Sequence, residues 1–97
     1  MIQLTRNEAQ NVAITSGEIL PDNSKRIAIY VTNTGANTIT ISKGVMPAVY
    51  GAGIILNPNG TWFETDSEGF LCWKGRIQVI SAPAGVSTIA ISETSEV

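Results

Sequence analysis

The stretch that decides the fold is KRIAIYVTN, residues 25–33, followed after a short loop by NTITIS, residues 37–42. Apolar and polar residues alternate in both segments, with the period of two that is typical of half-buried β-strands. The first segment places Ile27, Ile29 and Val31 on one face and Arg26, Ala28, Tyr30 and Thr32 on the other. The second segment places Ile39 and Ile41 inward, with Thr38, Thr40 and Ser42 outward. The glycine-containing loop NTGAN, residues 33–37, predicts that the two strands form a β-hairpin.

Further short strands are predicted at 53–56, 61–65, 70–73, 76–81 and 86–92, with weaker candidates at 12–15 and 18–20. Turn-forming residues separate them, as in NPNG at 57–60 and APAG at 82–85. No segment carries a helical stripe. This pattern predicts an all-β fold, either a small antiparallel β-sandwich or a jelly-roll-like barrel of about seven to nine short strands.

The chain of 97 residues has the size of one domain, so we expect a single β domain over residues 1–97. Within it, residues 1–10 are a candidate N-terminal arm and residues 94–97 a loose tail. The N-terminus shows no basic start followed by an apolar run, so a signal peptide is not expected. The apolar stretches are too short to span a membrane.

Charged residues make up 14% of the chain, compared with about 25% in an ordinary soluble domain. Threonine, serine and asparagine take their place. A hydroxyl-rich surface costs less to desolvate than an ionic one, so we expect much of the surface to contact other protein. The net charge is −2 and there is no basic run, which argues against a nucleic acid partner.

The sequence contains no histidine, which removes the commonest general base and the commonest metal ligand. We therefore predict a protein that is not an enzyme and that has no cofactor. Cys72, between Leu71 and Trp73, is interpreted as a small hydrophobic residue of a strand. Glu64, Asp66 and Glu68 alternate like calcium ligands, but the closing position of such a loop is Gly75, which leaves calcium open and favours a solvated turn.

Four aromatic residues lie close together in the sequence: Trp62, Phe63, Phe70 and Trp73. Trp62 and Phe63 are adjacent in a predicted strand and must point to opposite faces. One of them is then expected in the core and the other at the surface. An exposed aromatic ring can stack on a sugar or anchor a protein interface.

Residues 25–42 resemble the strand–loop–strand core of small tailed-bacteriophage virion proteins. In those proteins a Gly-rich segment with an apolar strand, a Pro/Gly turn, an aromatic–acidic strand and a late Ile/Val strand follow, here at 51–56, 57–60, 62–64 and 77–80. The resemblance covers residues 25–92. It implies a virion component, such as a capsid decoration (cement) protein on the capsid surface, made in the host cytoplasm. Such proteins are β-rich homo-oligomers, often trimers or dimers, that bind the major capsid protein across capsomer junctions.

Two hypotheses follow for the partner and for the residues that bind it. Capsid reinforcement would use edge strands, exposed aromatic residues and the N-terminal segment, and we predict as partner-binding residues Ile2, Leu4, Arg6, Tyr50, Trp62, Phe63 and Trp73. The alternative is a receptor- or carbohydrate-binding module of a phage tail fibre or baseplate. Its stacking platform would consist of Trp62, Phe63 and Trp73.

Overall fold

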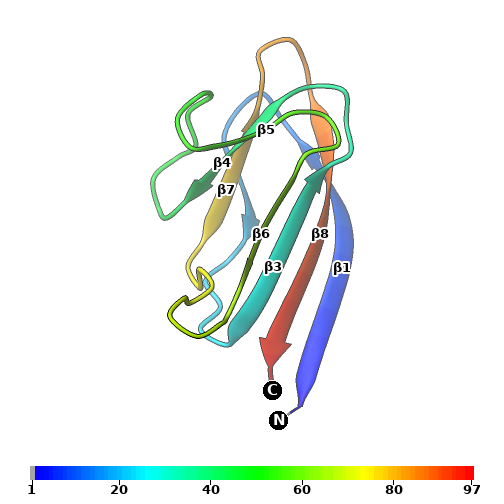
Figure 1. Ribbon diagram of the computed structural model, residues 1–97. Helices are drawn as coiled ribbons and strands as arrows, with labels where there is room; N and C mark the ends of the chain where they lie inside the picture. Colours follow the sequence, from blue (N-terminus) through cyan, green and yellow to red (C-terminus); the bar gives the residue numbers. More distant parts are fainter. Residues whose placement is uncertain (1) are drawn as a thin grey trace.

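The computed structural model describes residues 2–97, and these contain eight strands and no helix (Figure 1). The strands are β1 (Gln3–Val12), β2 (Gly17–Leu20), β3 (Arg26–Asn33), β4 (Ile39–Lys43), β5 (Ile54–Leu56), β6 (Thr61–Thr65), β7 (Ile77–Ser81) and β8 (Ser87–Glu96). The predicted all-β fold is confirmed. In this part of the chain there is no helix long and apolar enough to cross a membrane.

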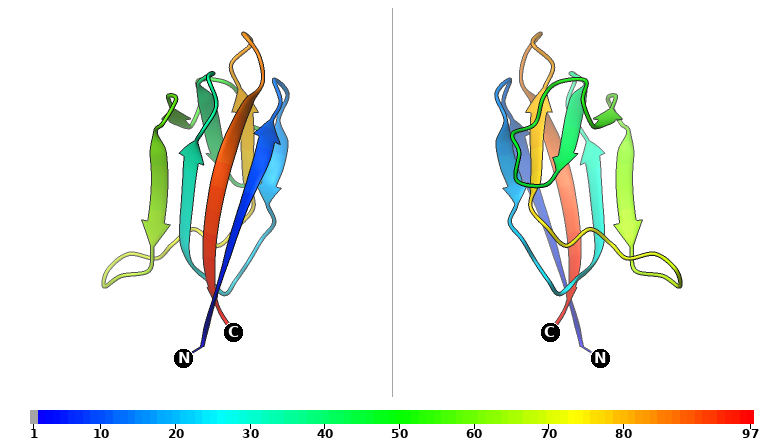
Figure 2. Two further views of the ribbon diagram at one scale, coloured as in Figure 1. Left: turned by 90° about the vertical axis from the view of Figure 1, so that its right-hand side faces the viewer. Right: turned by 90° about the vertical axis from the view of Figure 1, so that its left-hand side faces the viewer.

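The strands form two antiparallel sheets, which we call sheet A, with the order β1-β8-β3-β6, and sheet B, with the order β2-β7-β4-β5. Along the chain, β4 pairs with β5, β3 with β6, β2 with β7 and β1 with β8. The chain is therefore one long hairpin, rolled up so that β3 also pairs with β8 and β4 with β7. This connectivity is that of a jelly roll, and the two sheets pack face to face (Figure 2).

The core lies between the sheets and consists of the inward-facing residues of the alternating strands. Sheet A contributes Ile29, Val31 and Ile89, and sheet B contributes Ile41 and Ile77, all fully buried. Each such side chain contributes roughly 1.5–3 kcal/mol relative to an exposed one. The apolar residues at every second position of these strands thus form the core between the two sheets.

The predicted hairpin at residues 25–42 is wrong, because β3 lies in sheet A and β4 in sheet B. The N–H groups of Thr34 and Gly35 both donate to the carbonyl of Thr88 in β8, so the loop is still bound to sheet A after β3 has ended. The chain then crosses to sheet B. A period of two identifies both strands but does not say which strands are neighbours.

Asn33 holds this crossing in place from a fully buried position. Its side-chain NH₂ donates to the carbonyls of Asn37 (2.8 Å) and Leu56 (3.0 Å). Its side-chain oxygen accepts from the Gly35 N–H (3.1 Å) and the Ser87 hydroxyl (2.9 Å). One amide therefore joins the end of β3, the loop, the end of β5 and the start of β8.

Arg26 was expected on the outer face and is fully buried instead. The register of β3 against β8 shifts between Arg26 and Ala28, and this bulge turns Arg26 inward. Its Nε lies 2.7 Å from Glu93 Oε2. Its other nitrogens donate to three backbone carbonyls, those of Pro21, Trp73 and Gly75.

Residues 70–73 were predicted to be a strand, and that prediction is wrong. Only an isolated bridge between Ser67 and Phe70 forms there. The Cys72 and Trp73 N–H groups donate to the carboxylates of Asp66 and Glu64, each at 2.8 Å, in place of a neighbouring strand. The weak candidate at 12–15 is also wrong, because β1 ends at Val12.

The expected N-terminal arm and loose C-terminal tail do not form. Gln3 to Val12 pair with Ser87 to Glu96 in one continuous antiparallel register. The two ends of the chain therefore lie side by side at one end of sheet A (Figures 1 and 2). Met1 lies outside the described residues.

The outer face of sheet B is covered by the loop of residues 44–53, which lies in front of β4 and β7 in the right-hand view of Figure 2. The Gly51 N–H donates to Thr40 Oγ1, and Gln78 Nε2 donates to the carbonyls of Gly44 and Met46. Thr40, predicted to face solvent, is fully buried under this loop. Within the described chain, no comparable loop covers the outer face of sheet A.

Candidate functional site

Three rows of uncharged side chains cross the outer face of sheet A. The rows are Thr5–Thr94–Ala28–Thr65, Asn7–Ser92–Tyr30–Phe63 and Ala9–Ala90–Thr32–Thr61. They alternate along each strand with core residues such as Ile29 and Ile91, so they point away from the core. We call this set of residues the neutral face.

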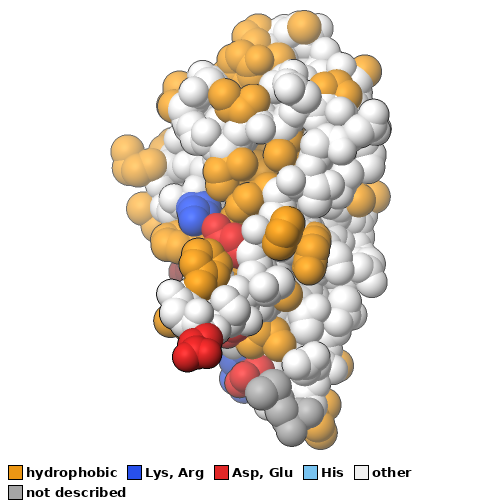
Figure 3. All heavy atoms as spheres, viewed as in Figure 1, with side chains coloured by type: hydrophobic (Ala, Val, Ile, Leu, Met, Phe, Trp, Pro, Cys, Tyr) orange, Lys and Arg blue, Asp and Glu red, His pale blue; other side chains and the backbone are white. Residues whose placement is uncertain are grey.

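Charged residues of the same strands point to the other side of the sheet. Glu93 is bound to Arg26, and Glu64 is bound to Lys43 at 2.8 Å. The right-hand side of Figure 3, where β8 and β1 lie, is accordingly white with scattered orange. A partner covering the neutral face would have no charged side chain of these rows to desolvate.

Hydroxyl groups of the neutral face bond to one another across the strands. Thr5 Oγ1 lies 3.0 Å from Thr94 Oγ1, and Thr32 Oγ1 lies 2.9 Å from Thr61 Oγ1. Cross-strand threonine pairs of this kind stabilise a sheet by about 0.2–1 kcal/mol each. Because part of their bonding capacity is already used, these groups lose less when water is removed from the face.

One aromatic pair stands on the neutral face. The rings of Tyr30 and Phe63 are stacked, with centroids 5.4 Å apart and planes 12° from parallel. Tyr30 is 43% exposed and Phe63 is 59% exposed. Exposed aromatic rings surrounded by small uncharged side chains are typical of the centre of protein interfaces.

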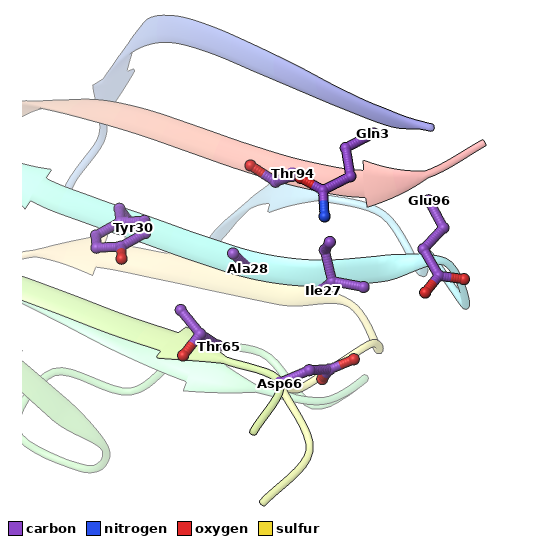
Figure 4. Close-up of a pocket in the computed structure, with 8 residues that line it drawn as sticks. All are labelled: Gln3, Ile27, Ala28, Tyr30, Thr65, Asp66, Thr94 and Glu96. Carbon is purple, nitrogen blue, oxygen red and sulfur yellow. The ribbon is translucent and has the colours of Figure 1, made fainter. Parts of the chain in front are cut away.

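A hollow of about 490 Å³ lies at the end of the neutral face near the chain termini (Figure 4). It is lined by Gln3, Ile27, Ala28, Tyr30, Thr65, Asp66, Thr94 and Glu96. In Figure 4, Tyr30 stands at one end of the hollow and the carboxylates of Asp66 and Glu96 at the other. It therefore combines an aromatic surface with polar groups that accept hydrogen bonds.

Asp66 is held in its ionised form by its neighbours. The backbone N–H of Cys72 is the main cause that lowers its pKa; burial opposes this shift, and Lys74 adds to it. Lys74 Nζ lies 3.2 Å from both carboxylate oxygens. The hollow consequently presents a negative group well below neutral pH.

The loop of residues 44–53 forms a second uncharged surface, on the opposite side of the sandwich. Its large apolar side chains are exposed: Val45 (69%), Met46 (71%), Val49 (61%) and Tyr50 (43%). Ala48 anchors the loop, because it is buried and its N–H donates to Ser16 Oγ at 2.7 Å. We call residues 44–53 the apolar loop.

The predicted partner-binding residues of the N-terminal segment lie together on one side of β1. Ile2, Leu4 and Arg6 alternate with Thr5 and Asn7 of the neutral face, so they point to the inner side of sheet A. All three are exposed, because β2, the edge strand of sheet B, is much shorter than β1.

The predicted aromatic platform does not assemble. Trp62 and Trp73 are partly buried and pack against the core, whereas Phe63 faces outward. Trp73 also donates its Nε1–H to the Arg76 carbonyl at 3.0 Å. The expectation that Trp62 and Phe63 point to opposite faces is confirmed. Tyr50 lies apart from all three, on the apolar loop.

Two of the three acidic residues weighed as calcium ligands, Glu64 and Asp66, are directed to different partners, and the third, Glu68, is exposed. Glu64 binds Lys43 and the Trp73 N–H, and Asp66 binds the Cys72 N–H and Lys74. In residues 2–97, no three or more histidine, cysteine, aspartate or glutamate side chains gather as a metal site. Cys72 is only 3% exposed, which agrees with its interpretation as a small buried residue.

From the sequence, Tyr30 was expected on the outer face of its strand, but it was not among the predicted partner-binding residues, and the neutral face was not predicted. The signal was present in the alternation itself. In residues 26–32, every residue on the face that alternates with Ile29 and Val31 is uncharged, with the exception of Arg26. In residues 88–92, every residue that alternates with Ile89 and Ile91 is uncharged as well. Pairing β8 with β3 is what brings these residues into common rows.

No family model matches this chain, and no curated protein matches it.

Proposed function

We propose that this chain is a non-enzymatic structural protein of a virus particle, a capsid decoration protein that binds the major capsid protein and stabilises the head. The observation that carries the proposal is the presence of two uncharged contact surfaces, the neutral face and the apolar loop, on opposite sides of one small sandwich. A protein that reinforces a shell has to touch at least two neighbours. Surfaces on opposite sides allow one copy to bridge them.

The binding mechanism would be multivalent burial of uncharged surface. Each contact buries small side chains and a few large apolar ones, with Tyr30 and Phe63 at the centre of one surface and Met46 and Val49 on the other. Neither contact has to be strong alone. Two linked contacts bind more tightly than either one, because the second forms at a high effective concentration.

Two further points support a virion as the site of action. Residues 25–92 resemble small tailed-bacteriophage virion proteins in their pattern, and jelly rolls occur among virus capsid domains. The second point is an analogy of fold and does not by itself assign a function. The protein would be made in the host cytoplasm and would end on the capsid surface.

The test is to mix the purified chain with shells that lack it and to measure binding by light scattering and by co-sedimentation. Two variants each add one charge to one contact surface, Ala90→Glu in the neutral face and Met46→Glu in the apolar loop. Ser24→Glu, at an exposed turn away from both surfaces, is the matched control. We expect saturable binding that both variants weaken and the control retains. Absence of saturable binding, or wild-type binding by both variants, would refute the proposal.

A glycan-binding role in a tail fibre or baseplate is the second candidate, and the hollow beside Tyr30 is the observation that favours it. Sugar rings stack on aromatic side chains, and carboxylates such as those of Asp66 and Glu96 accept hydrogen bonds from sugar hydroxyls. Tyr30→Ala should abolish binding in a glycan screen. Tyr50→Ala, at an equally exposed tyrosine, should not. A screen without any ligand would remove this candidate.

A further inference from the structure

β1 is the longest of the edge strands in the described part of the chain, with ten residues against three to five in β2, β5 and β6. β1 pairs only with β8 and forms the edge of sheet A along its whole length. Its register against β8 has no bulge, and its sequence, QLTRNEAQNV, contains neither proline nor lysine. Bulges, prolines and lysines are devices by which edge strands ordinarily avoid pairing with another chain, and β1 has none of them. It does carry a further device of this kind, the inward-pointing charges of Arg6 and Glu8, so a partner strand has to match these two charges.

The hydrogen-bond pattern fixes which backbone groups face this edge. The Val97 N–H donates to the Ile2 carbonyl, so Ile2 directs its backbone toward β8. Residues of an antiparallel strand alternate in this respect, and Leu4, Arg6 and Glu8 therefore also face β8. The N–H and C=O groups of Thr5, Asn7, Ala9 and Asn11 point to the open edge.

A second copy of β1 can add to this edge only in certain registers. Two antiparallel edges form a ladder when outward-facing residues oppose outward-facing residues, so the twofold axis passes through a residue and not between two residues. The residue on the axis can be Thr5, Arg6, Asn7, Glu8 or Ala9. Centring on Thr5 brings Arg6 close to Leu4 of the copy and leaves much of each strand unpaired. Centring on Asn7 pairs the strands along their full length, with Thr5 opposite Ala9 and Ile2 opposite Val12.

Charge selects the same register. With Asn7 on the axis, Arg6 lies opposite Glu8 of the other copy and Glu8 lies opposite its Arg6. These are non-hydrogen-bonded positions, where opposing side chains approach most closely. Both side chains are partly exposed, Arg6 to 55% and Glu8 to 36%, and their own ion pair is long, at 3.5 Å. Within the chain Arg6 also lies 3.7 Å from Glu93, and Glu8 accepts a hydrogen bond from Gln10, so the contacts across the dimer would add to these bonds. Shifting the register by two residues in either direction would bring Arg6 opposite Arg6 or Glu8 opposite Glu8.

We propose that two copies of this chain pair through β1 in an antiparallel register centred on Asn7. The dimer has one continuous sheet, in which the sheet A of one copy continues into that of the other. Ile2 and Leu4, which are 70% and 64% exposed, face Val12 and Gln10 of the other copy across the new ladder. The inference does not depend on the proposed capsid role, since it follows from β1 alone.

Charge-reversal variants test the register directly. Arg6→Glu alone, or Glu8→Arg alone, places like charges opposite each other twice in the homodimer. The dissociation constant of each variant's dimer should be at least about tenfold higher than that of the wild type. The reason is that a cross-strand pair of opposite charges stabilises the ladder, whereas a pair of like charges destabilises it. In an equimolar mixture of the two variants, every opposing pair becomes Arg with Glu, and the dimer should return.

Sedimentation velocity over a range of concentrations measures each sample, and circular dichroism shows that each variant is folded. The matched control is Lys25→Glu, which reverses the charge of an exposed residue that β8 separates from β1. This variant should dimerise like the wild type. Asn7→Pro removes an outward N–H without removing a bond to β8 and should abolish the dimer even in the mixture. A monomeric wild type, a trimer, or a mixture no better than its components would overturn the proposal.

Discussion

Replacing Asn33 by aspartate tests whether one buried amide organises the crossing between the two sheets. The change keeps the shape of the side chain and keeps the oxygen that accepts from Gly35 and Ser87. It replaces the NH₂ group by an oxygen that faces the carbonyls of Asn37 and Leu56, at 2.8 and 3.0 Å in the native protein. Both carbonyls then lose their donor.

Each buried polar group left without a partner costs about 1–3 kcal/mol, so Asn33→Asp should lower the free energy of unfolding by roughly 2–6 kcal/mol. That is a large part of the roughly 5–15 kcal/mol typical of a natural domain. The carbonyls also raise the pKa of the introduced carboxyl above its unfolded value. The variant is therefore most stable when that carboxyl is protonated, and its deficit relative to wild type should grow as pH rises above about 4.

Urea denaturation followed by tryptophan fluorescence is a suitable assay, because Trp62 and Trp73 both pack against the core. Asn37→Asp is the matched control: the same chemical change in the same loop removes one exposed bond, from Asn37 Nδ2 to the Val86 carbonyl. It should cost about 0.5–1.5 kcal/mol. The reasoning is refuted if the two variants are equally stable, or if the deficit of Asn33→Asp is independent of pH.

Three further predictions concern other ionisable side chains. Arg26→Met should destabilise the protein by at least about 3–5 kcal/mol in urea titrations, because Glu93 loses its nearest ion-pair partner and three backbone carbonyls lose a donor. Adding Glu93→Leu should recover the part of the loss that the unpaired carboxylate causes; equal stability of the single and double variants would contradict this. The lowered pKa of Asp66 means that its stabilisation is present above its unfolded pKa and is lost as pH falls through the folded value. The difference in thermal stability between wild type and Asp66→Asn should thus shrink in acid, and a difference that stays constant down to low pH would argue against it. Burial raises the pKa of the Cys72 thiol, so a thiol-specific reagent should label the native protein slowly and label it fully once urea unfolds it; rapid labelling of the native chain would show that the site is open.

Most strands could be predicted from the sequence, because a half-buried strand imprints its period of two on its own residues. Ile29 and Val31, or Ile89 and Ile91, lie inward wherever their strand is placed. The predicted hairpin failed for the complementary reason. Whether β3 pairs with β4 or with β8 depends on residues far apart in the sequence, and no local pattern encodes that choice.

The errors at single residues have local physical causes that the sequence does not display. Arg26 turns inward because of a bulge that the pairing with β8 creates. Thr40 is buried by a loop that folds over it, and not by its own strand. Residues 70–73 carry the composition of a strand, but the N–H groups of Cys72 and Trp73 donate to the carboxylates of Asp66 and Glu64 and not to a neighbouring strand. Each outcome follows from a tertiary contact that overrides a local preference.

The neutral face is not simply a consequence of the low charge of the chain. The charged residues within the strands of sheet A that point to its inner side are Arg6, Glu8, Arg26, Glu64 and Glu93, and only Glu96, at the end of β8, points outward. Ordinary domains show the reverse distribution, since charge is costly to bury and cheap to expose. A monomer surrounded by water gains nothing from an uncharged sheet face beside a ten-residue edge strand that has no bulge, proline or lysine. Covering the neutral face with another chain costs little free energy, because its uncharged side chains are cheap to desolvate. Covering the β1 edge with another strand is favourable, because the edge strand then completes its hydrogen bonds. An assembled state in which the outer face and the β1 edge of sheet A are both covered, as we propose, would account for this distribution of charge.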